Sequence, residues 1–248
     1  MKKNVSGSED IPMNHSEKIF FLFVFVVLSL AGCLNLKETA QKINYYSLEY
    51  DPPVVRNWKL ETGNSTIPNS KSQIPNPKSP PLPFVIRVER FQAAPFYDTN
   101  KIVFKEGAFK RDTYIYHKWW AKPGDIVSYF LARDIKASGL FEAVFAFDKS
   151  LSCSHLIEGT VDEFFEQDEA DSWQAVLAVS ITLMAENEPD ISKKILLQKK
   201  YNAKELCAQK NPRHLAEAMG KALSKISEKI ITDIHNCLSF RSQKTKSK

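Results

Sequence analysis

The residue with the most distinctive chemistry is Cys33, whose thiol follows two small residues, Ala31 and Gly32. Before them comes an apolar run, residues 19–30, without charge, proline or glycine. This run is shorter than the roughly 20 apolar residues that a membrane-spanning helix needs, and its length is typical of a signal-peptide core. Small side chains before the cut fit the narrow pocket of a signal peptidase. The pattern predicts a signal peptide over residues 1–32, with cleavage between Gly32 and Cys33.

The four residues Leu30-Ala31-Gly32-Cys33 resemble the bacterial lipobox. That resemblance implies a diacylglycerol on the Cys33 sulfur and an acyl chain on the new amino terminus. Each buried methylene contributes about 0.8 kcal/mol and one acyl chain holds only reversibly, so two or three chains should anchor the protein permanently. The alternative is a coincidental or buried cysteine. We expect no cofactor other than this covalent lipid.

The residue after the cysteine favours one of the two bacterial membranes. Position 34 is leucine and not aspartate, and by resemblance to the enterobacterial sorting rule this predicts the periplasmic face of the outer membrane. Residues 33–44 would form a tether that keeps the folded part within about 40 Å of the bilayer. Acidic residues dilute the positive charge before the apolar run, and translation from Met13 rather than Met1 would leave a more ordinary start.

Other reactive residues lack the spacing of known catalytic or metal sites. The acidic run over residues 162–172 has no nearby histidine or lysine partner in the sequence, which favours a solvated hairpin turn over acid–base chemistry. The remaining cysteines, Cys153, Cys207 and Cys237, lack CxxC spacing, although one disulfide could form. There is no GxGxxG, GxxxxGK[ST] or GxSxG motif. We expect no catalytic residues, no metal and no enzymatic activity.

The composition predicts one globular domain preceded by a polar insertion. The formal net charge is +5, without a basic stripe interleaved with aromatic residues, which argues against nucleic acid as a partner. Residues 45–50 read as a first strand. Residues 51–82, rich in Pro, Asn and Ser, read as a flexible insertion because they cannot bury enough apolar surface to offset their ordering entropy. The main domain is expected over residues 83–240, with a basic tail over residues 241–248.

Hydrophobic periodicity predicts the elements of that domain. Alternation of apolar and polar residues indicates strands, and apolar residues spaced by three and four indicate helices. Strands are expected at residues 84–91, 101–106, 112–120, 140–147, 156–165, 172–186 and 193–205, and helices at residues 123–138 and 213–238. The order predicts an α+β two-layer sandwich, in which two α-helices pack on one face of an antiparallel or mixed β-sheet.

Two stretches carry a resemblance to a known family. They are "RVERFQAAPFYDTNKIVFK" at residues 87–105 and "YIYHKWWAKPGDIVSYFLARDIKASGLFEAV" at residues 114–144. They are similar to the ABC-type transport auxiliary lipoprotein family, from which this chain departs by its long insertion. The resemblance implies a non-catalytic outer-membrane subunit of a system that moves phospholipid or other hydrophobic molecules between membranes. Its implied partners are a substrate-binding protein of the mammalian-cell-entry type, as direct contact, and an ABC permease with its ATPase, indirectly.

The aromatic residues supply the candidates for contact with a partner or with lipid, namely Tyr97, Trp119 and Trp120. Two adjacent tryptophans on a strand point to opposite faces, so at least one should be exposed. We expect Trp119 to be at an interface and Trp120 to be packed with Tyr114 and Tyr116 beneath the first helix.

Two other functions and one assembly state stay open at this point. A regulator of a peptidoglycan synthase would share a small α+β domain behind a polar tether. A periplasmic enzyme would require a cluster of buried polar residues in a deep pocket. Assembly into a homo-oligomer also stays open.

Overall fold

The computed structural model describes residues 14–17, 19–20, 22–23, 41–55, 80–147, 151–169 and 172–246. The chain divides into two compact units, Met1–Lys42 and Ile43–Lys248. The expected cleavage and lipidation site at Gly32 and Cys33 lies outside the described residues, as does most of the polar insertion. Among the helices that the structure describes, none is both long and apolar enough to cross a membrane.

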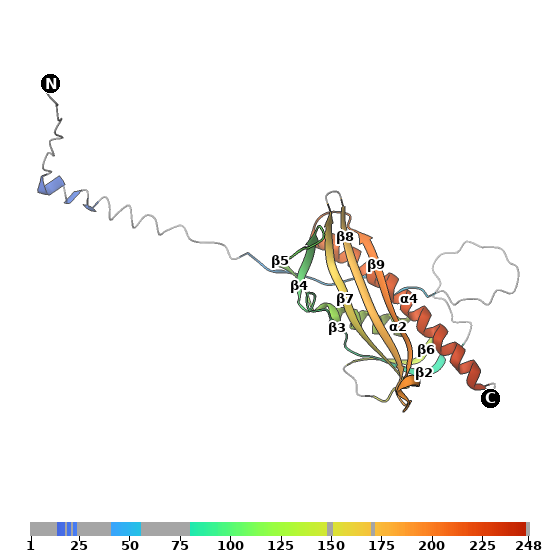
Figure 1. The fold of residues 1–248 in the computed structure, drawn as a ribbon. Coiled ribbons are helices and arrows are strands. Elements are labelled where there is room, and N and C mark those ends of the chain that lie inside the picture. The colour runs from blue at the N-terminus through green and yellow to red at the C-terminus, as the bar shows by residue number, and fades with distance from the viewer. Residues whose placement is uncertain are drawn as a thin grey trace, which may run out of the picture. The chain divides into compact units, whose positions relative to one another are not determined.

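The second unit consists of strands and helices whose order matches the predicted one (Figure 1). The elements are β1 (Asn44–Tyr46), β2 (Leu82–Val88), β3 (Gln92–Ala93), β4 (Lys101–Glu106), β5 (Lys110–Trp119), α2 (Pro123–Ala137), β6 (Phe141–Ala146), β7 (His155–Glu169), β8 (Ser172–Ala185), α3 (Ile191–Lys194), β9 (Ile195–Leu206) and α4 (Pro212–Lys246). The short strand β3 and the single-turn helix α3 were not predicted, because two to four residues are too few to show a period.

The long strand β7 organises the sheet. Along one edge it pairs with β8 in antiparallel register, and β8 pairs in turn with β9. Along the other edge, β2, β3 and β4 pair with successive parts of β7, all in parallel register. Strand β6 extends the sheet beyond β2, while β5 and then β1 extend it beyond β4. The sheet is therefore mixed, as the predicted fold class allows.

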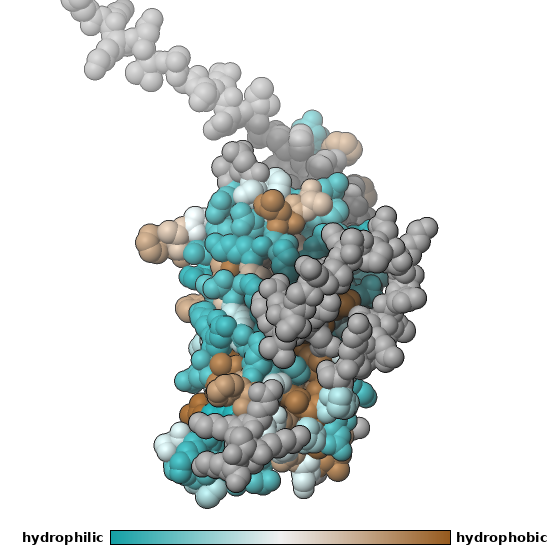
Figure 2. All heavy atoms as spheres, turned by 90° about the vertical axis from the view of Figure 1, so that its right-hand side faces the viewer, coloured by the Kyte–Doolittle hydropathy of each residue, from teal (hydrophilic) through white to brown (hydrophobic). Residues whose placement is uncertain are grey.

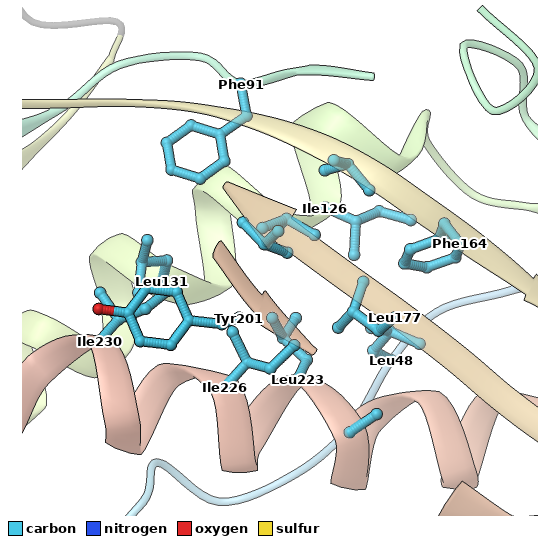
Figure 3. Packing of buried hydrophobic residues seen from close by; sticks show 14 of the residues in the cluster. Leu48, Phe91, Ile126, Leu131, Phe164, Leu177, Tyr201, Leu223, Ile226 and Ile230 are labelled. Atoms are coloured by element: carbon cyan, nitrogen blue, oxygen red, sulfur yellow. The ribbon is translucent and has the colours of Figure 1, made fainter. Parts of the chain in front are cut away.

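Both long helices lie on one face of this sheet (Figure 1). Helix α2 packs on β2, β3, β6 and β7, helix α4 packs on β8 and β9, and the two helices touch each other. Figure 3 shows apolar side chains of both helices meeting those of β7, β8 and β9, together with Leu48 from the segment after β1. This confirms the α+β sandwich with two helices on one face.

The first strand and the expected basic tail differ from the prediction. The first strand covers Asn44–Tyr46 and not residues 45–50, because its partner β5 ends at Trp119 and the last ladder contact is from Trp120 N–H to the Tyr46 carbonyl, at 2.8 Å. At the other end of the chain, α4 continues to Lys246. Residues 241–246, expected in a basic tail, thus belong to the last turns of this helix.

Candidate functional site

The structure reverses the expected roles of the two tryptophans. Trp119 is 1% exposed and packs edge-on against Phe164 in the core, with ring centroids 5.2 Å apart. Trp120 is 74% exposed, and its ring meets Tyr45 edge-on at 5.6 Å. One tryptophan faces outward, as expected, but it is Trp120 and not Trp119.

An irregularity in β5 explains this error. Opposite β4, the register moves from Thr113, which faces Val103, to Lys118, which faces Lys101. Five steps along β5 therefore match only two steps along β4. Extra residues in one strand of a pair shift which side chains point inward, so the alternation that begins at Tyr114 does not continue to Trp119.

The other aromatic candidates are also placed by the structure. Tyr97 is 4% exposed and stacks on Phe165 at 5.9 Å, so it is a core residue and offers no surface to a partner. Tyr114 is half-buried and its hydroxyl donates to Glu166. Tyr116 is exposed, contrary to the expected core position. Of the three residues predicted to contact a partner or lipid, only Trp120 is accessible.

Trp120 borders an open pocket of about 500 Å³, which we call the aromatic pocket. It lies between the segment that follows β1, the first two turns of α2 and the end of β6. The residues that line it are Ser47, Leu48, Arg90, Trp120, Ala121, Asp125, Ile126, Tyr129, Phe130 and Phe147. Most of these side chains are apolar or aromatic, and the volume lies within the range of pockets that bind small molecules or the side chains of a partner.

One ion pair is the charged part of the aromatic pocket. Arg90 Nη1 lies 2.9 Å from Asp125 Oδ1, and the Arg90 guanidinium sits 4.4 Å from the centre of the Phe147 ring. Because the two charges pair with each other, the pocket offers mainly apolar surface to a ligand. This arrangement suits the binding of an apolar group and provides no nucleophile with an adjacent base.

One wall of the aromatic pocket is held in place by the half-buried Tyr50 and Arg133 and the buried Asp134, a cluster that we call the latch. The Tyr50 hydroxyl donates to Asp134 Oδ2 at 2.7 Å, and Arg133 donates to Asp134 Oδ1 from Nε at 2.9 Å and Nη2 at 2.7 Å. The Asp134 side chain is fully buried. Burial and the nearby carboxylate raise the pKa of Tyr50, so the phenol stays protonated and remains a donor.

Aromatic stacking and a close helix approach complete the latch. The Tyr50 ring stacks on Phe130 at 5.2 Å, and the Arg133 guanidinium lies 4.4 Å from the centre of the Tyr50 ring. On the other side, a Cβ atom at Gly220 of α4 would lie 3.4 Å from the Glu49 carbonyl oxygen. The segment that leads from β1 is thus fixed between α2 and α4.

The acidic run expected at a solvated turn contains one buried carboxylate. Glu166 is 2% exposed, and burial raises the pKa of its carboxyl above the ordinary 4.5 despite the hydrogen bond from Tyr114. A pKa raised in the fold means that the ionised carboxylate destabilises the protein. This cost is present above the folded pKa and is relieved as the pH falls to the unfolded value.

Replacing this carboxyl with its neutral amide tests the effect. We expect Glu166→Gln to unfold at a higher temperature than the unchanged protein at pH 8, because the amide carries no charge and can still accept from Tyr114. The difference should disappear below pH 4.5, the ordinary pKa of the group. Thermal unfolding followed by circular dichroism measures this, with the exposed neighbour Glu169→Gln as a control that changes little. A lower unfolding temperature for Glu166→Gln at pH 8 would contradict the assignment.

The remaining reactive groups among the described residues are the cysteines and the side chains that could bind a metal ion. Among the described residues, no three His, Cys, Asp or Glu side chains are grouped so that they could hold a metal ion. Cys153, Cys207 and Cys237 are all free thiols in the structure. Burial and the nearby Glu166 carboxylate raise the pKa of Cys207 to about 11, which keeps this thiol protonated and unreactive.

Sequence reasoning missed most of the aromatic pocket. Arg90, Tyr129 and Phe147 were not singled out, because each comes from a different element and none forms a local motif. One signal was available in the sequence: Tyr129 lies off the apolar stripe of its helix, and it is indeed 59% exposed.

Comparison with known proteins adds a family and a fold. A family described as "ABC-type transport auxiliary lipoprotein component" matches residues 66–231. The structure is similar to that of protein XCC0632 from Xanthomonas campestris, with a TM-score of 0.60, 16% identity, and coverage of 68% of this chain and 94% of that chain. It is also similar to an uncharacterized protein, with a TM-score of 0.54, 12% identity, and coverage of 78% and 99%. At these identities the likeness shows the fold alone. No curated protein matches the sequence.

Proposed function

Because this chain belongs to the ABC-type transport auxiliary lipoprotein family, we propose that it is a non-catalytic docking subunit of a transenvelope system that carries hydrophobic molecules. The family match confirms the resemblance seen in the sequence. In the proposal, lipid on Cys33 holds the chain at the periplasmic face of the outer membrane. The cargo is phospholipid or another hydrophobic molecule, and an ATPase on the inner membrane supplies the energy.

The hydrogen bonds of the acidic run support a role without catalysis. Asp162 accepts from the Ser180 hydroxyl, Glu166 accepts from Tyr114, and Asp168 pairs with Lys210. Carboxylates that are engaged in structural pairs between strands are poor candidates for proton transfer to a substrate. These residues stabilise the β7–β8 hairpin and its surroundings.

The aromatic pocket is the observation that carries the docking proposal. Trp120, Tyr129 and Arg90 are of the residue types that dominate the binding energy of protein interfaces, and they surround a preformed pocket. We assign this pocket to an apolar side chain of the substrate-binding protein of the mammalian-cell-entry type. Strand β5 begins at the β4–β5 hairpin and ends beside the pocket. Because β1 runs parallel to β5, the chain reaches β1 from the hairpin side, and the pocket lies at the other end of β5.

Truncation of Trp120 tests this assignment. We expect Trp120→Ala to weaken binding of the substrate-binding protein by about 2 kcal/mol, or roughly 30-fold in Kd, because a central aromatic anchor is lost. The measurement is a titration of the purified partner against the full chain in detergent. Phe240→Ala is the matched control, since Phe240 is exposed to a similar degree and lies near the end of α4.

The possible outcomes separate the proposal from its alternatives. Equal loss of binding in Trp120→Ala and Phe240→Ala, or no loss in either, would remove the aromatic pocket from the docking surface. Binding of a bifunctional peptidoglycan synthase, and not of the transport protein, would favour the role of a cell-wall regulator instead.

A further inference from the structure

We propose that the β4–β5 hairpin is a membrane-contact surface, which rests on phospholipid while the anchor holds the chain. The inference rests on the proposed function, because it requires the lipid on Cys33. It adds a second point of attachment to the bilayer, made by side chains of the folded domain.

The hairpin displays apolar side chains that make little contact with the rest of the protein. Phe109 in its turn is 93% exposed, Ile115 in β5 is 73% exposed, and the neighbouring Phe96 is 69% exposed. For comparison, Figure 2 shows the face on the right-hand side of Figure 1, where the described residues are mostly hydrophilic and the hydrophobic ones form small groups. Exposed apolar side chains that gather in one region, unlike single ones, mark a surface that contacts a partner or a membrane.

The basic residues of the hairpin suit a phospholipid surface. Lys105, Lys110 and Arg111 flank the turn together with the acidic Glu106 and Asp112, so that the stretch 105–112 has a net charge of +1. Lys110 pairs with Glu106 at 2.6 Å, which leaves Lys105 and Arg111 as the basic side chains that can meet headgroups. The Arg111 guanidinium lies 5.4 Å from the centre of the Phe96 ring. Long basic side chains beside apolar ones can reach headgroups while the apolar groups enter the acyl region.

The direction of β1 along β5 leaves the hairpin within reach of the anchor. Strand β1 pairs with β5 in parallel register, with Asn44 opposite His117. The chain therefore enters β1 from the side on which β5 begins, and β5 begins at the β4–β5 hairpin. Figure 1 shows the segment that carries β1 reaching the sheet beside β5. From Cys33 to Asn44 the chain can span up to about 40 Å. From His117 back to Lys110 the strand covers at most about 24 Å, so the tether is long enough for the turn to touch the bilayer.

The shape of the hairpin favours a bilayer over a protein as the occupant. Phe109 lies in the turn, and its side chain is open on nearly all sides. A protein partner recognises such a side chain by a complementary pocket and a polar rim, whereas a fluid bilayer accepts a single projecting apolar group without complementarity. The proposed occupant is therefore the phospholipid surface that carries the anchor.

Site-specific photocrosslinking in the intact, membrane-held chain tests this inference. The photoreactive residue is introduced as Phe109→p-benzoylphenylalanine, with Ile115→p-benzoylphenylalanine as a second probe. The matched control is Phe240→p-benzoylphenylalanine, because Phe240 is 70% exposed and the C-terminal end of α4 lies at the opposite end of the fold (Figure 1). After irradiation, we expect the peptides with positions 109 and 115 to gain the mass of one phospholipid, and the peptide with position 240 to stay unmodified.

Each contrary result has a separate meaning. Lipid adducts at position 240 equal to those at position 109, or none at position 109, would overturn the inference. A protein adduct at position 109 in place of lipid would assign the hairpin to a partner or to a second copy of this chain. If the chain is already in the soluble fraction before irradiation, the lipid anchor and the proposed function are wrong. If the chain is anchored but its hairpin stays unlabelled, only the membrane contact of the hairpin is wrong.

Discussion

Asp134→Ala is expected to lower the free energy of unfolding by about 3 kcal/mol, because removing one partner of a buried ion pair costs about 3–5 kcal/mol and Arg133 keeps some contact with solvent. The substitution also leaves the half-buried Tyr50 hydroxyl without its acceptor. The segment that carries Leu48 should then loosen from the two helices and deform the aromatic pocket. Urea denaturation followed by circular dichroism measures the loss of stability.

A matched control exists on the same helix. Asp125 forms a surface ion pair with Arg90, and Asp125→Ala should cost less than about 1 kcal/mol. Tyr50→Phe, which removes one hydroxyl, should cost about 1 kcal/mol. If Asp134→Ala is no more destabilising than Asp125→Ala, the latch does not hold the segment that follows β1.

Cys33→Ser is expected to remove the chain from the outer membrane almost completely. A serine hydroxyl cannot form the thioether to diacylglycerol, and the acyl chains that would hold the protein permanently are then absent. We expect the unchanged protein in the outer-membrane fraction and Cys33→Ser in the soluble or inner-membrane fractions. The measurement is separation of the envelope on a density gradient, followed by immunodetection.

Another cysteine provides the comparison for this experiment. Cys237 is a half-buried thiol on α4, and its sulfur lies 3.6 Å from the Leu196 carbonyl oxygen, so it is a structural residue. Cys237→Ser should leave the chain in the outer membrane. Outer-membrane retention of Cys33→Ser at the level of Cys237→Ser would show that the anchor is not the thiol at position 33.

Local patterns in the sequence predicted the helices and the central strands well. In α2, Pro123 stands at the first helical position, and Ile126, Val127, Leu131 and Ile135 form the buried stripe that the spacing predicts. In β8 the alternate residues from Ala175 to Leu183 are buried, as the spacing predicts, although Val176 and Ala178 between them are buried as well. These features depend on residues within one element, so the sequence alone suffices.

Features that depend on contacts between residues far apart in the sequence could not be predicted from local patterns. The irregular register of β5 is set by its partner β4, and it reversed the expected roles of Trp119 and Trp120. The latch joins Tyr50 to Asp134 across 84 positions of the chain. The aromatic pocket takes four residues from α2 and one or two from each of several other segments, so its existence follows only from the packing of α2 against the segment after β1.

Capture of the intact chain from detergent-solubilised whole cell envelopes, which contain both membranes, followed by identification of the bound proteins, tests the docking role most directly. We expect a substrate-binding protein of the mammalian-cell-entry type, together with smaller amounts of the ABC permease and ATPase to which it connects. Binding of the first protein should fall in Trp120→Ala and persist in Phe240→Ala. Capture of a bifunctional peptidoglycan synthase without any of the transport subunits would contradict the proposed function.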